Sequence, residues 1–352
     1  MVFRESRRSI DAIRDYTHLL ARGLRDEGAA AGVALLEGSA VPEPPRGTEA
    51  LLINYNPFSW GRWGWAPSLP GSVARLRNGR KRPVIVVIVH EPAVPWHGVK
   101  QTLMGAWQRT QLAALLRLAD LAMVSIEPWV PLIQRWGGSG TAVHHLPVGS
   151  NLPDMRSARH EQRARLGCRS DTLVLAFFGG CHPSRPVDHL RQAVVATSRL
   201  KKRLIVLNLG AGAPSFDGLG GGSEIITPGS LRPAEVARLL SAADLFAAPY
   251  VDGASSRRGT IAAALQHGLP TVSMAGPLTD PFLRRSGALV LVSSNDATAF
   301  GEAVANLADD PGARAVVSLR ARRLFDERFA WRVIARRLLG LISATLDGKN
   351  NG

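Results

Sequence analysis

The stretch ADLFAAPYVDGASSRRGTIAAALQHGLPTV, from Ala243 to Val272, decides the fold. It opens with a short apolar segment typical of a buried strand and passes through a polar loop into an alanine-rich segment typical of a helix. Gly268 and Pro270 are a stop signal for that helix, and a second apolar run follows them. A strand, a helix and a strand in this order predict an α/β architecture with a parallel sheet.

The polar loop of this stretch lies between the carboxyl end of the predicted strand and the start of the helix. Open α/β sheets bind ligands at that edge, where a helix N-terminus offers free N–H groups and the positive end of its dipole. The loop therefore predicts an anion site, most simply for a phosphate, built by Ser255, Ser256, Arg257, Arg258, Gly259 and Thr260. The alternative is that Ser256 or Thr260 caps the helix and both arginines are solvated.

A second loop has the same composition. The segment LVLAFFGGCHPSRPVDHL, from Leu173 to Leu190, contains a predicted strand, then Gly179 and Gly180, then Arg185 ahead of a predicted helix. Glycines allow close approach of a ligand to the backbone, and a guanidinium suits an anion. Cys181 and His182 make only a weak metal candidate, because two ligands do not complete a zinc site.

Strand-like and helix-like segments alternate along most of the 352 residues, a length that favours two domains. The Pro/Gly-punctuated and then charged segment HHLPVGSNLPDMRSARHEQRARLG interrupts the alternation. The sequence therefore predicts a first α/β domain over residues 1–150, a second over 151–325, and a terminal helix over 326–346.

In the first half, the apolar run Val84–Val89 delivers His90 and Glu91 to the carboxyl end of a predicted strand. A histidine there suits proton handling or a hydrogen bond to a phosphate or sugar. The alternative is that His90 only fixes the loop that holds Trp96 and His97. The loop NYNPFSWGRWGWAP (54–67) is suited to stacking on sugar rings, or else to packing, through Tyr55, Trp60, Trp63 and Trp65.

The chain is strongly basic, with a formal net charge of +15, and only five of its 43 basic residues are lysines. Solvated helix faces, an anionic small molecule, a membrane surface or nucleic acid would each explain the excess. The arginines are spread along the chain without a nucleic-acid motif, which disfavours nucleic acid. No apolar run approaches the roughly 18 residues of a membrane span, and two cysteines fit a reducing compartment, so we expect a cytoplasmic protein.

Together these segments resemble family-4 glycosyltransferases of the GT-B architecture, from about Ile10 to Ile342. DYTHLLARGLRDEG resembles the first helix of the family, HEP its acceptor-side histidine, FFGGCHPSRPVDHL its Gly-Arg-x(4)-Lys-Gly loop, and FAWRVIARRLLGLI its closing helix. The chain departs from the pattern where Gly180 replaces the loop arginine and Arg185 its lysine. Ala263 and a position near Ser255 replace the paired glutamates. The chain also starts where a first strand is expected to be complete, so that strand is missing or is supplied by MVFRES.

The resemblance implies two Rossmann-like domains that face each other across a cleft and a retaining, metal-independent transferase without a cofactor. It would move a sugar from a nucleotide-diphosphate sugar to a hydroxyl acceptor in glycan, polysaccharide or glycosylated-metabolite biosynthesis. His90, Arg185 and Arg258 are the implied catalytic residues. The donor would be bound by Gly179, Gly180, Ser255, Ser256, Arg257, Gly259 and Thr260, and the acceptor would lie near Asp15, Tyr16, Tyr55 and Trp60.

Three other readings stay open from the sequence. The missing glutamates are compatible with a degenerate, non-catalytic scaffold that binds a nucleotide-sugar or a partner enzyme. A sugar-nucleotide epimerase would need cleft carboxylates, and nucleic-acid binding would show salt dependence. The basic balance also suits a lipid-linked acceptor and peripheral contact with an anionic inner membrane face, through Arg4, Arg7, Arg8, Arg75, Arg77, Arg80, Lys81 and Arg82.

Overall fold

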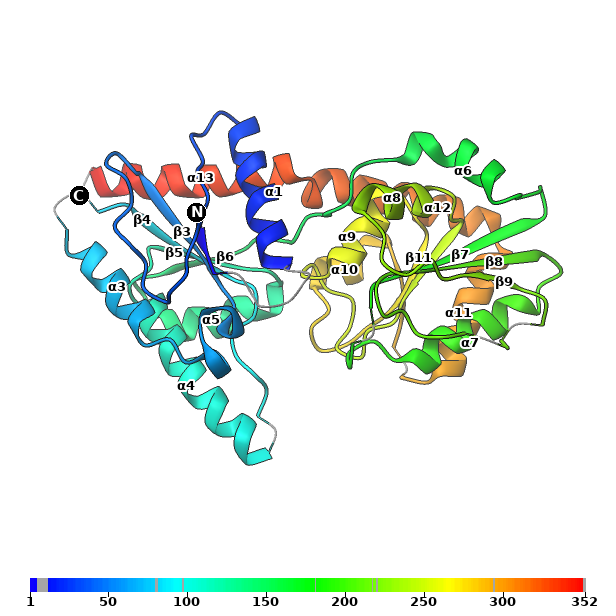
Figure 1. Ribbon diagram of the computed structural model, residues 1–352, viewed down its shortest axis with the longest axis horizontal. Coiled ribbons are helices and arrows are strands. Elements are labelled where there is room, and N and C mark those ends of the chain that lie inside the picture. Colours follow the sequence, from blue (N-terminus) through cyan, green and yellow to red (C-terminus); the bar gives the residue numbers. More distant parts are fainter. Residues whose placement is uncertain are drawn as a thin grey trace. The chain divides into compact units, whose positions relative to one another are not determined.

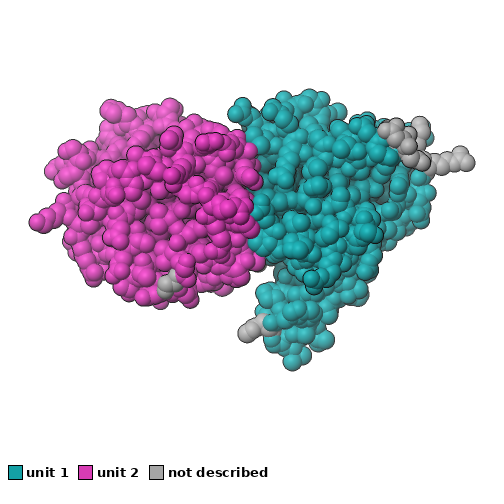
Figure 2. All heavy atoms as spheres, turned by 180° about the vertical axis from the view of Figure 1, so that it is seen from behind, with its two compact units in different colours: residues 1–147, 331–352 teal, residues 148–330 magenta. Residues whose placement is uncertain are grey.

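The computed structural model describes residues 1–4, 12–79, 82–96, 98–180, 182–216, 218–219, 221–293 and 295–350. The chain forms two compact units (Figure 2). Unit 1 combines Met1–Pro147 with Trp331–Gly352, and unit 2 is Val148–Ala330. The chain therefore changes unit after Pro147 and again after Ala330, compared with predicted boundaries at residues 150 and 325.

Unit 1 is built on a six-stranded sheet with the order β2-β1-β3-β4-β5-β6, in which each pair of neighbours is parallel. Its strands are β1 (Val2–Phe3), β2 (Ala34–Leu35), β3 (Ala50–Tyr55), β4 (Val84–Val89), β5 (Leu121–Val124) and β6 (Ala142–His145). All six residues of β4 are buried, as expected for a central strand of a parallel sheet covered on both faces. Its helices are α1 (Ala12–Asp26), α2 (Pro57–Trp60), the 3-10 helix η1 (Arg62–Gly64), α3 (Ser68–Arg77), α4 (Gly98–Leu116), the 3-10 helix η2 (Glu127–Trp129), α5 (Val130–Gly137) and α13 (Trp331–Asn350).

The start of the chain resolves one of the alternatives left by the sequence. Val2 pairs with Ala34 on one side and with Ile53 on the other, so the short strand β1 lies inside the sheet. Val2 and Phe3 therefore supply the first strand. The residues that follow, 5–11, include Arg7, Arg8 and Ser9 and lie outside the described part of the chain.

Unit 2 has the same architecture, a six-stranded parallel sheet with the order β12-β11-β10-β7-β8-β9. Its strands are β7 (Thr172–Phe178), β8 (Arg203–Leu209), β9 (Glu224–Ile226), β10 (Leu245–Ala248), β11 (Thr271–Met274) and β12 (Val290–Val292). Its helices are η3 (Arg156–Ala158), α6 (Arg159–Arg165), α7 (Val187–Ser198), α8 (Pro233–Ser241), α9 (Gly259–Gln266), α10 (Pro281–Ser286), α11 (Ala297–Asp309), α12 (Pro311–Leu324) and the π-helix η4 (Phe325–Phe329) (Figure 1). The α/β class with two parallel sheets is confirmed.

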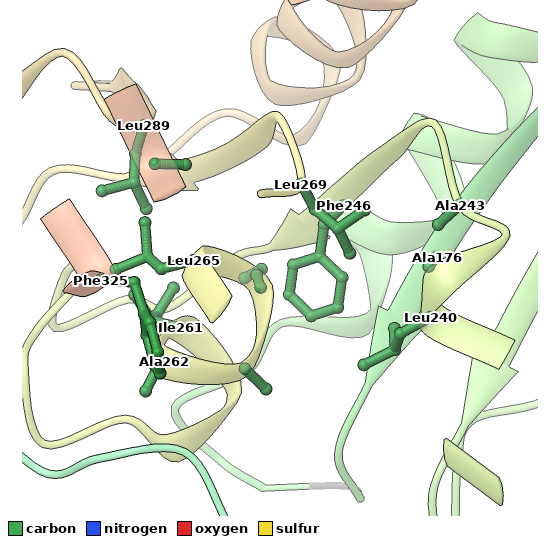
Figure 3. Close-up of a cluster of buried hydrophobic side chains, with 14 of the residues drawn as sticks. Ala176, Leu240, Ala243, Phe246, Ile261, Ala262, Leu265, Leu269, Leu289 and Phe325 are labelled. Carbon is green, nitrogen blue, oxygen red and sulfur yellow. The ribbon is translucent and has the colours of Figure 1, made fainter. Parts of the chain in front are cut away.

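Side chains of β7 alternate between two cores, one on each face of the sheet. Val174 and Ala176 belong to a cluster that also holds Phe246, Ile261 and Leu265 (Figure 3). Leu173, Leu175 and Phe177 belong to the cluster on the opposite face. This alternation is the side-chain geometry of an extended strand. The apolar residues of α9 pack against one of the two faces that it creates.

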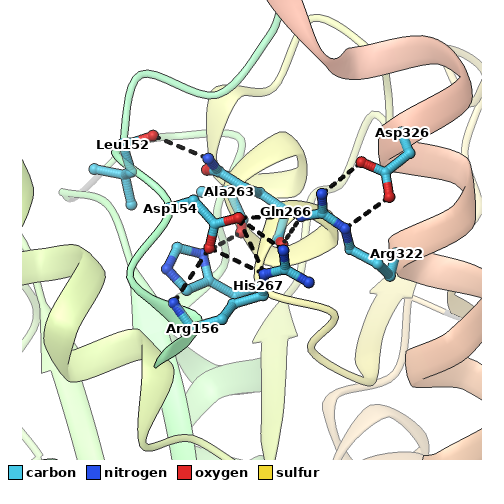
Figure 4. A network of polar contacts seen from close by, with 8 residues as sticks. All are labelled: Leu152, Asp154, Arg156, Ala263, Gln266, His267, Arg322 and Asp326. Atoms are coloured by element: carbon cyan, nitrogen blue, oxygen red, sulfur yellow. Dashed lines mark hydrogen bonds and ion pairs between the residues drawn. The ribbon is translucent and has the colours of Figure 1, made fainter. Parts of the chain in front are cut away.

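A polar network fixes the carboxyl end of α9 (Figure 4). The side chain of Gln266 donates to the carbonyl of Leu152 at 3.1 Å, and Arg322 donates to the carbonyl of Gln266 at 2.7 Å. The hydrogen bond from Arg156 lowers the pKa of Asp154, outweighing the opposite effect of burial, and the Asp154 carboxylate lies 3.6 Å from Arg322. The network thus ties α9 to the segment that enters unit 2 and to α12.

The last helix, α13, belongs to unit 1 and packs against α1. Gly23 makes the close approach feasible, because a Cβ there would lie 3.1 Å from the carbonyl oxygen of Trp331 and 3.3 Å from the Cβ of Ala335. Arg336 adds a pair of 3.0 Å hydrogen bonds to Glu27.

Candidate active site

The candidate site of unit 2 lies at the carboxyl edge of its sheet, where the loops after β7 and β8 touch. The N–H of Gly179 donates to Leu209 at 2.9 Å. A Cβ on Gly180 would lie 2.7 Å from the carbonyl oxygen of Ala211, so the two backbones leave no room for a side chain there. Gly179 also has a φ of +115°, which favours glycine. Close packing of the chain's own backbones therefore requires glycine at Gly180, and the close approach of a ligand to this edge stays a prediction.

The loops singled out in the sequence meet here. A Cβ on Gly179 would lie 3.4 Å from both the Arg185 guanidinium and the Cγ2 of Thr260. The Arg185 side chain is 6% exposed and donates to the carbonyl of Gly179. The predicted donor-side residues Gly179, Arg185 and Thr260 therefore come from two separate loops into one place.

Helix α9 starts at this point, and the side chain of its N-cap residue makes no capping hydrogen bond. Its first residue is Gly259, and Arg258 is the N-cap residue with an extended backbone. The hydroxyl of Thr260 pairs with the hydroxyl of Tyr250 at 2.5 Å instead of capping the helix. The first N–H groups of a helix have no partner within it, so α9 offers them, and its positive dipole end, to an anion. The capping alternative for Thr260 is wrong.

The two arginines before α9 are paired rather than solvated, which excludes the second half of that alternative. One Nη of Arg258 donates to both carboxylate oxygens of Asp252, at 2.8 and 2.7 Å, and to the hydroxyl of Ser184 at 3.1 Å. Its guanidinium lies 4.3 Å from the ring centroid of Tyr250. Arg257 shares the same carboxylate, and all three charged side chains are less than one-fifth exposed. Arg185, Arg257 and Arg258 with Asp252 sum to a formal charge of +2, and the carboxylate of Asp280 on the Ser256 N–H reduces the sum to +1.

Asp252 is the residue that sequence reasoning left without a role. The available signal was its spacing, five and six residues before Arg257 and Arg258 in one loop. Spacing alone does not predict which arginine a carboxylate in the loop will pair with, because contacts with other segments of the fold determine the course of the loop backbone. Here Gly253, with a φ of +93°, fits against Gly276, where a Cβ would lie 2.5 Å from the nitrogen of Gly276.

Two predicted donor contacts need correction. Ser255 and Ser256 are fully buried, so their hydroxyls do not face a ligand in this structure. The N–H of Ser256 donates to the buried carboxylate of Asp280 at 2.6 Å, and its carbonyl accepts from Val148 at 2.9 Å. Both serines lie in the buried part of the loop, and the backbone N–H and C=O of Ser256 have their hydrogen-bond partners inside unit 2.

In unit 1, His90 follows β4 and is oriented by a residue that the sequence analysis did not assign. Its Nε2 lies 2.9 Å from the amide oxygen of Asn54, whose amide nitrogen lies 3.4 Å from the carbonyl of Val2 and donates to it. Because the amide nitrogen faces a carbonyl, the amide oxygen is the acceptor and Nε2 carries the proton. The ring of Tyr16 meets the imidazole edge to face, with centroids 4.6 Å apart.

The predicted acceptor residues separate into buried and exposed groups. Tyr55 and Trp60 are fully buried, and the indole N–H of Trp60 donates to the carbonyl of Asn54 at 2.8 Å, so both belong to the core and do not contact an acceptor in this structure. Tyr16 is also buried, and burial raises the pKa of its hydroxyl. Asp15 is exposed in the first turn of α1. Sequence did not separate these residues because the loop mixes core and surface aromatics.

No group of three or more histidine, cysteine or acidic residues that could hold a metal ion occurs within the described ranges. Cys181, half of the weak metal candidate, lies outside them, as does His97. No helix in the part of the chain that the structure describes is long and apolar enough to cross a membrane. That His90, Gly180, Arg185 and Arg258 line one cleft stays a prediction.

Comparison with known proteins gives matches in sequence and in structure. Residues 172–310 match the family described as Glycosyl transferases group 1. D-inositol 3-phosphate glycosyltransferase from Saccharomonospora viridis is 30% identical over 234 residues, 60% of this chain and 52% of that protein. A second such enzyme, from Catenulispora acidiphila, is 28% identical over 236 residues, 62% of this chain and 55% of that protein. The chain thus spans about half the length of the curated relatives it matches.

Solved structures match nearly the whole chain. Sucrose-phosphate synthase from Thermosynechococcus elongatus superposes with a TM-score of 0.68 at 15% identity, covering 99% of this chain and 96% of that one. WaaG, a glycosyltransferase involved in lipopolysaccharide biosynthesis, gives 0.63 at 15% identity and covers 97% and 99%. Anabaena HepE in complex with UDP-glucose gives 0.61 at 15% identity and covers 97% and 99%. At these identities the likeness shows the fold, that of GT-B structures.

Proposed function

We propose, from the premise that this chain carries a glycosyl transferases group 1 domain on a GT-B fold, that it is a retaining transferase. It would transfer a sugar from a nucleotide-diphosphate sugar to a hydroxyl acceptor. One observation carries the proposal: the N-terminus of α9, two arginines and the Gly179–Gly180 backbone converge at one sheet edge. HepE, which shares the fold, binds UDP and UDP-glucose, which supports a nucleotide-sugar as the donor class.

The diphosphate is the part of the donor that this edge fits. A nucleotide-sugar diphosphate carries about two negative charges, and the three arginines with Asp252 and Asp280 leave a net positive charge of +1 that would attract it. Backbone N–H groups of α9 would hold one phosphate, and the Arg258 fork would reach it from the N-cap position. Arg185, which also donates to the carbonyl of Gly179, would contact the diphosphate from the side of the loop after β7.

The chemistry follows from where charge develops. As the glycosidic bond breaks, the leaving diphosphate gains negative charge, so its interaction with Arg185 and Arg258 strengthens in the transition state. This lowers the barrier to bond cleavage without requiring a metal ion. His90, held by Asn54 with its proton on Nε2, would hydrogen-bond near the reacting sugar on the acceptor side.

The acceptor is proposed only as a hydroxyl compound of a sugar, lipid-linked or metabolite class, and the protein as a cytoplasmic enzyme at or near the inner membrane face. The paired glutamates of the family are replaced, but Arg257, Arg258 and Asp252 occupy the same loop with a charge that suits a diphosphate. No observation favours the non-catalytic scaffold.

The test is a donor screen with UDP-, GDP-, ADP- and TDP-sugars. We expect one donor to raise the unfolding temperature and to release its nucleoside diphosphate in the presence of hydroxyl acceptors. Activity should persist in excess chelator. Absence of both stabilisation and release with every donor would overturn the proposal, and loss of activity in chelator restored by magnesium or manganese would overturn the arginine-based mechanism.

A further inference from the structure

Unit 1 carries a projecting surface that the proposed transfer chemistry does not use. The N-terminal half of α4 extends away from the body of the unit, as Figures 1 and 2 show. Large apolar side chains on α4 and on the neighbouring loops are 50–79% exposed, an unusual concentration for a soluble protein surface. We call this the aromatic face and define it as Trp63, Trp65, Trp96, Val99 and Leu103.

The members of this face are connected by contacts. The indole of Trp107, on α4, donates to the carbonyl of Trp63 at 3.1 Å, and its ring meets that of Trp65 edge to face at 6.1 Å. Val99 and Leu103 precede Trp107 at helical steps of four, so the three side chains follow one stripe of α4. The aromatic face is therefore held in place by α4 and η1 rather than by a loose loop.

Basic groups are interleaved with the indoles. The ammonium of Lys100 lies 5.5 Å and the guanidinium of Arg62 lies 5.0 Å from the ring centroid of Trp63. Arg109 covers the ring of Trp96 at 3.7 Å. Arg62, Lys100 and Arg109 therefore place three formal positive charges directly beside the indoles. These charges would attract an anionic surface.

Trp63 has an uncommon backbone conformation. It is the single non-glycine residue with positive φ, +56°, within the described ranges. A bulky side chain is disfavoured in this left-handed region, and asparagine or glycine would adopt it more readily. The half-exposed indole makes only part of the contact that burial would give it, so packing alone does not explain the tryptophan at this position.

We infer that the aromatic face docks unit 1 on a lipid bilayer that contains anionic lipid. Tryptophans prefer the boundary between headgroups and acyl chains, where the ring is in an apolar environment and the N–H remains near polar groups. Val99 and Leu103 would enter the same layer, and Arg62 and Lys100 would contact the lipid phosphates. This differs from the basic face expected from sequence, of which Arg7, Arg8, Arg80 and Lys81 lie outside the described residues.

The test is flotation of the full chain with vesicles of phosphatidylcholine, with and without phosphatidylglycerol, at low and physiological salt. Wild type should bind the anionic vesicles, and its tryptophan fluorescence should shift to the blue. Trp63→Asn combined with Leu103→Ser should weaken binding by about tenfold or more while the unfolding temperature stays equal or rises. Arg62→Glu with Lys100→Glu should weaken it by about tenfold and remove its salt dependence.

Matched controls come from unit 2. Val316 and Leu319 are exposed on α12, and their serine variants should bind vesicles as wild type does, as should Lys201→Glu. Absence of wild-type binding at low salt, or unchanged binding in both aromatic-face variants, would overturn the inference. Self-association lost in those variants would instead assign the face to a second copy of the chain. Loss of turnover on a soluble sugar acceptor with unchanged vesicle binding would assign it to sugar stacking. Since flotation needs no turnover, its failure is distinguishable from failure of the proposed function.

Discussion

The carboxyl edges of the two sheets share a topology but differ in what their loops present. In unit 2 the loops are charged and internally paired, with Arg257 and Arg258 on Asp252 and glycine backbones in contact. In unit 1 one histidine is fixed by Asn54, and the adjoining loop displays indoles. The same parallel scaffold thus carries a candidate anion site in one half and an aromatic surface in the other, because loops and not strands carry the chemistry.

The largest effect is expected from removing an arginine at the carboxyl edge of the unit 2 sheet. Arg258→Ala should lower kcat/KM by about 10- to 1,000-fold, because in the proposed mechanism the guanidinium contacts the charge that develops in the transition state. Arg258→Lys should recover only part, since it keeps the charge and loses the fork. The exposed arginine Arg285, on α10 of the same unit, is the control, and its alanine variant should turn over normally. Wild-type turnover and nucleotide affinity in Arg258→Ala would remove this residue from the site.

The variant Asp252→Asn distinguishes the contribution of Asp252 to stability from its effect on ligand binding. Both arginines would lose a carboxylate partner while mostly buried, so the free energy of unfolding should fall by about 1–3 kcal/mol. A bound diphosphate supplies the missing negative charge. A saturating nucleoside diphosphate should therefore raise the unfolding temperature more in the variant than in wild type. Equal shifts in both proteins would mean that the diphosphate does not reach these arginines.

Two glycines of the same edge should respond differently to alanine. Gly180→Ala places a Cβ 2.7 Å from the oxygen of Ala211, so stability and turnover should both decrease. Gly259→Ala meets nothing within 4 Å, and it should raise stability by about 0.4–1 kcal/mol. If the diphosphate approaches the start of α9, Gly259→Ala should still raise KM by about three- to tenfold. An unchanged KM for Gly259→Ala would place the ligand elsewhere.

The smallest effect concerns pH. Burial lowers the pKa of His267, at the end of α9, from its ordinary value of 6.5. A histidine whose folded pKa is lowered favours folding when neutral, so stability is complete above about pH 6.5 and decreases as pH falls through the more acidic range. Burial lowers the pKa of His144 and His189 as well. Thermal unfolding of His267→Gln between pH 7.5 and 5 should therefore show a weaker pH dependence than wild type.

The sequence predicted the architecture and the meeting of the two loops because apolar periodicity and Gly/Pro turn signals, which are local, identify strand ends and helix starts. Gly179, Arg185 and Thr260 were found from strand ends and helix starts. It did not predict that Ser255 and Ser256 would be buried, or that Trp60 would be core and Trp63 surface, because burial depends on partners distant in sequence. Asn54, which orients His90, was missed for the same reason: its partners are Val2 and His90, far from it along the chain.

The assignment of α13 to unit 1 has a consequence for how the chain becomes folded. Residues 148–330 form a continuous segment with its own sheet and cores, so all elements of unit 2 are available for folding once this segment has left the ribosome. The first 147 residues do not contain all of unit 1, because the surface of α1 around Gly23 and Tyr16 is covered by a helix that starts at Trp331. During synthesis that surface of α1 therefore remains uncovered while nearly 200 further residues, those of unit 2, are added to the chain. It is a candidate for chaperone contact during this time.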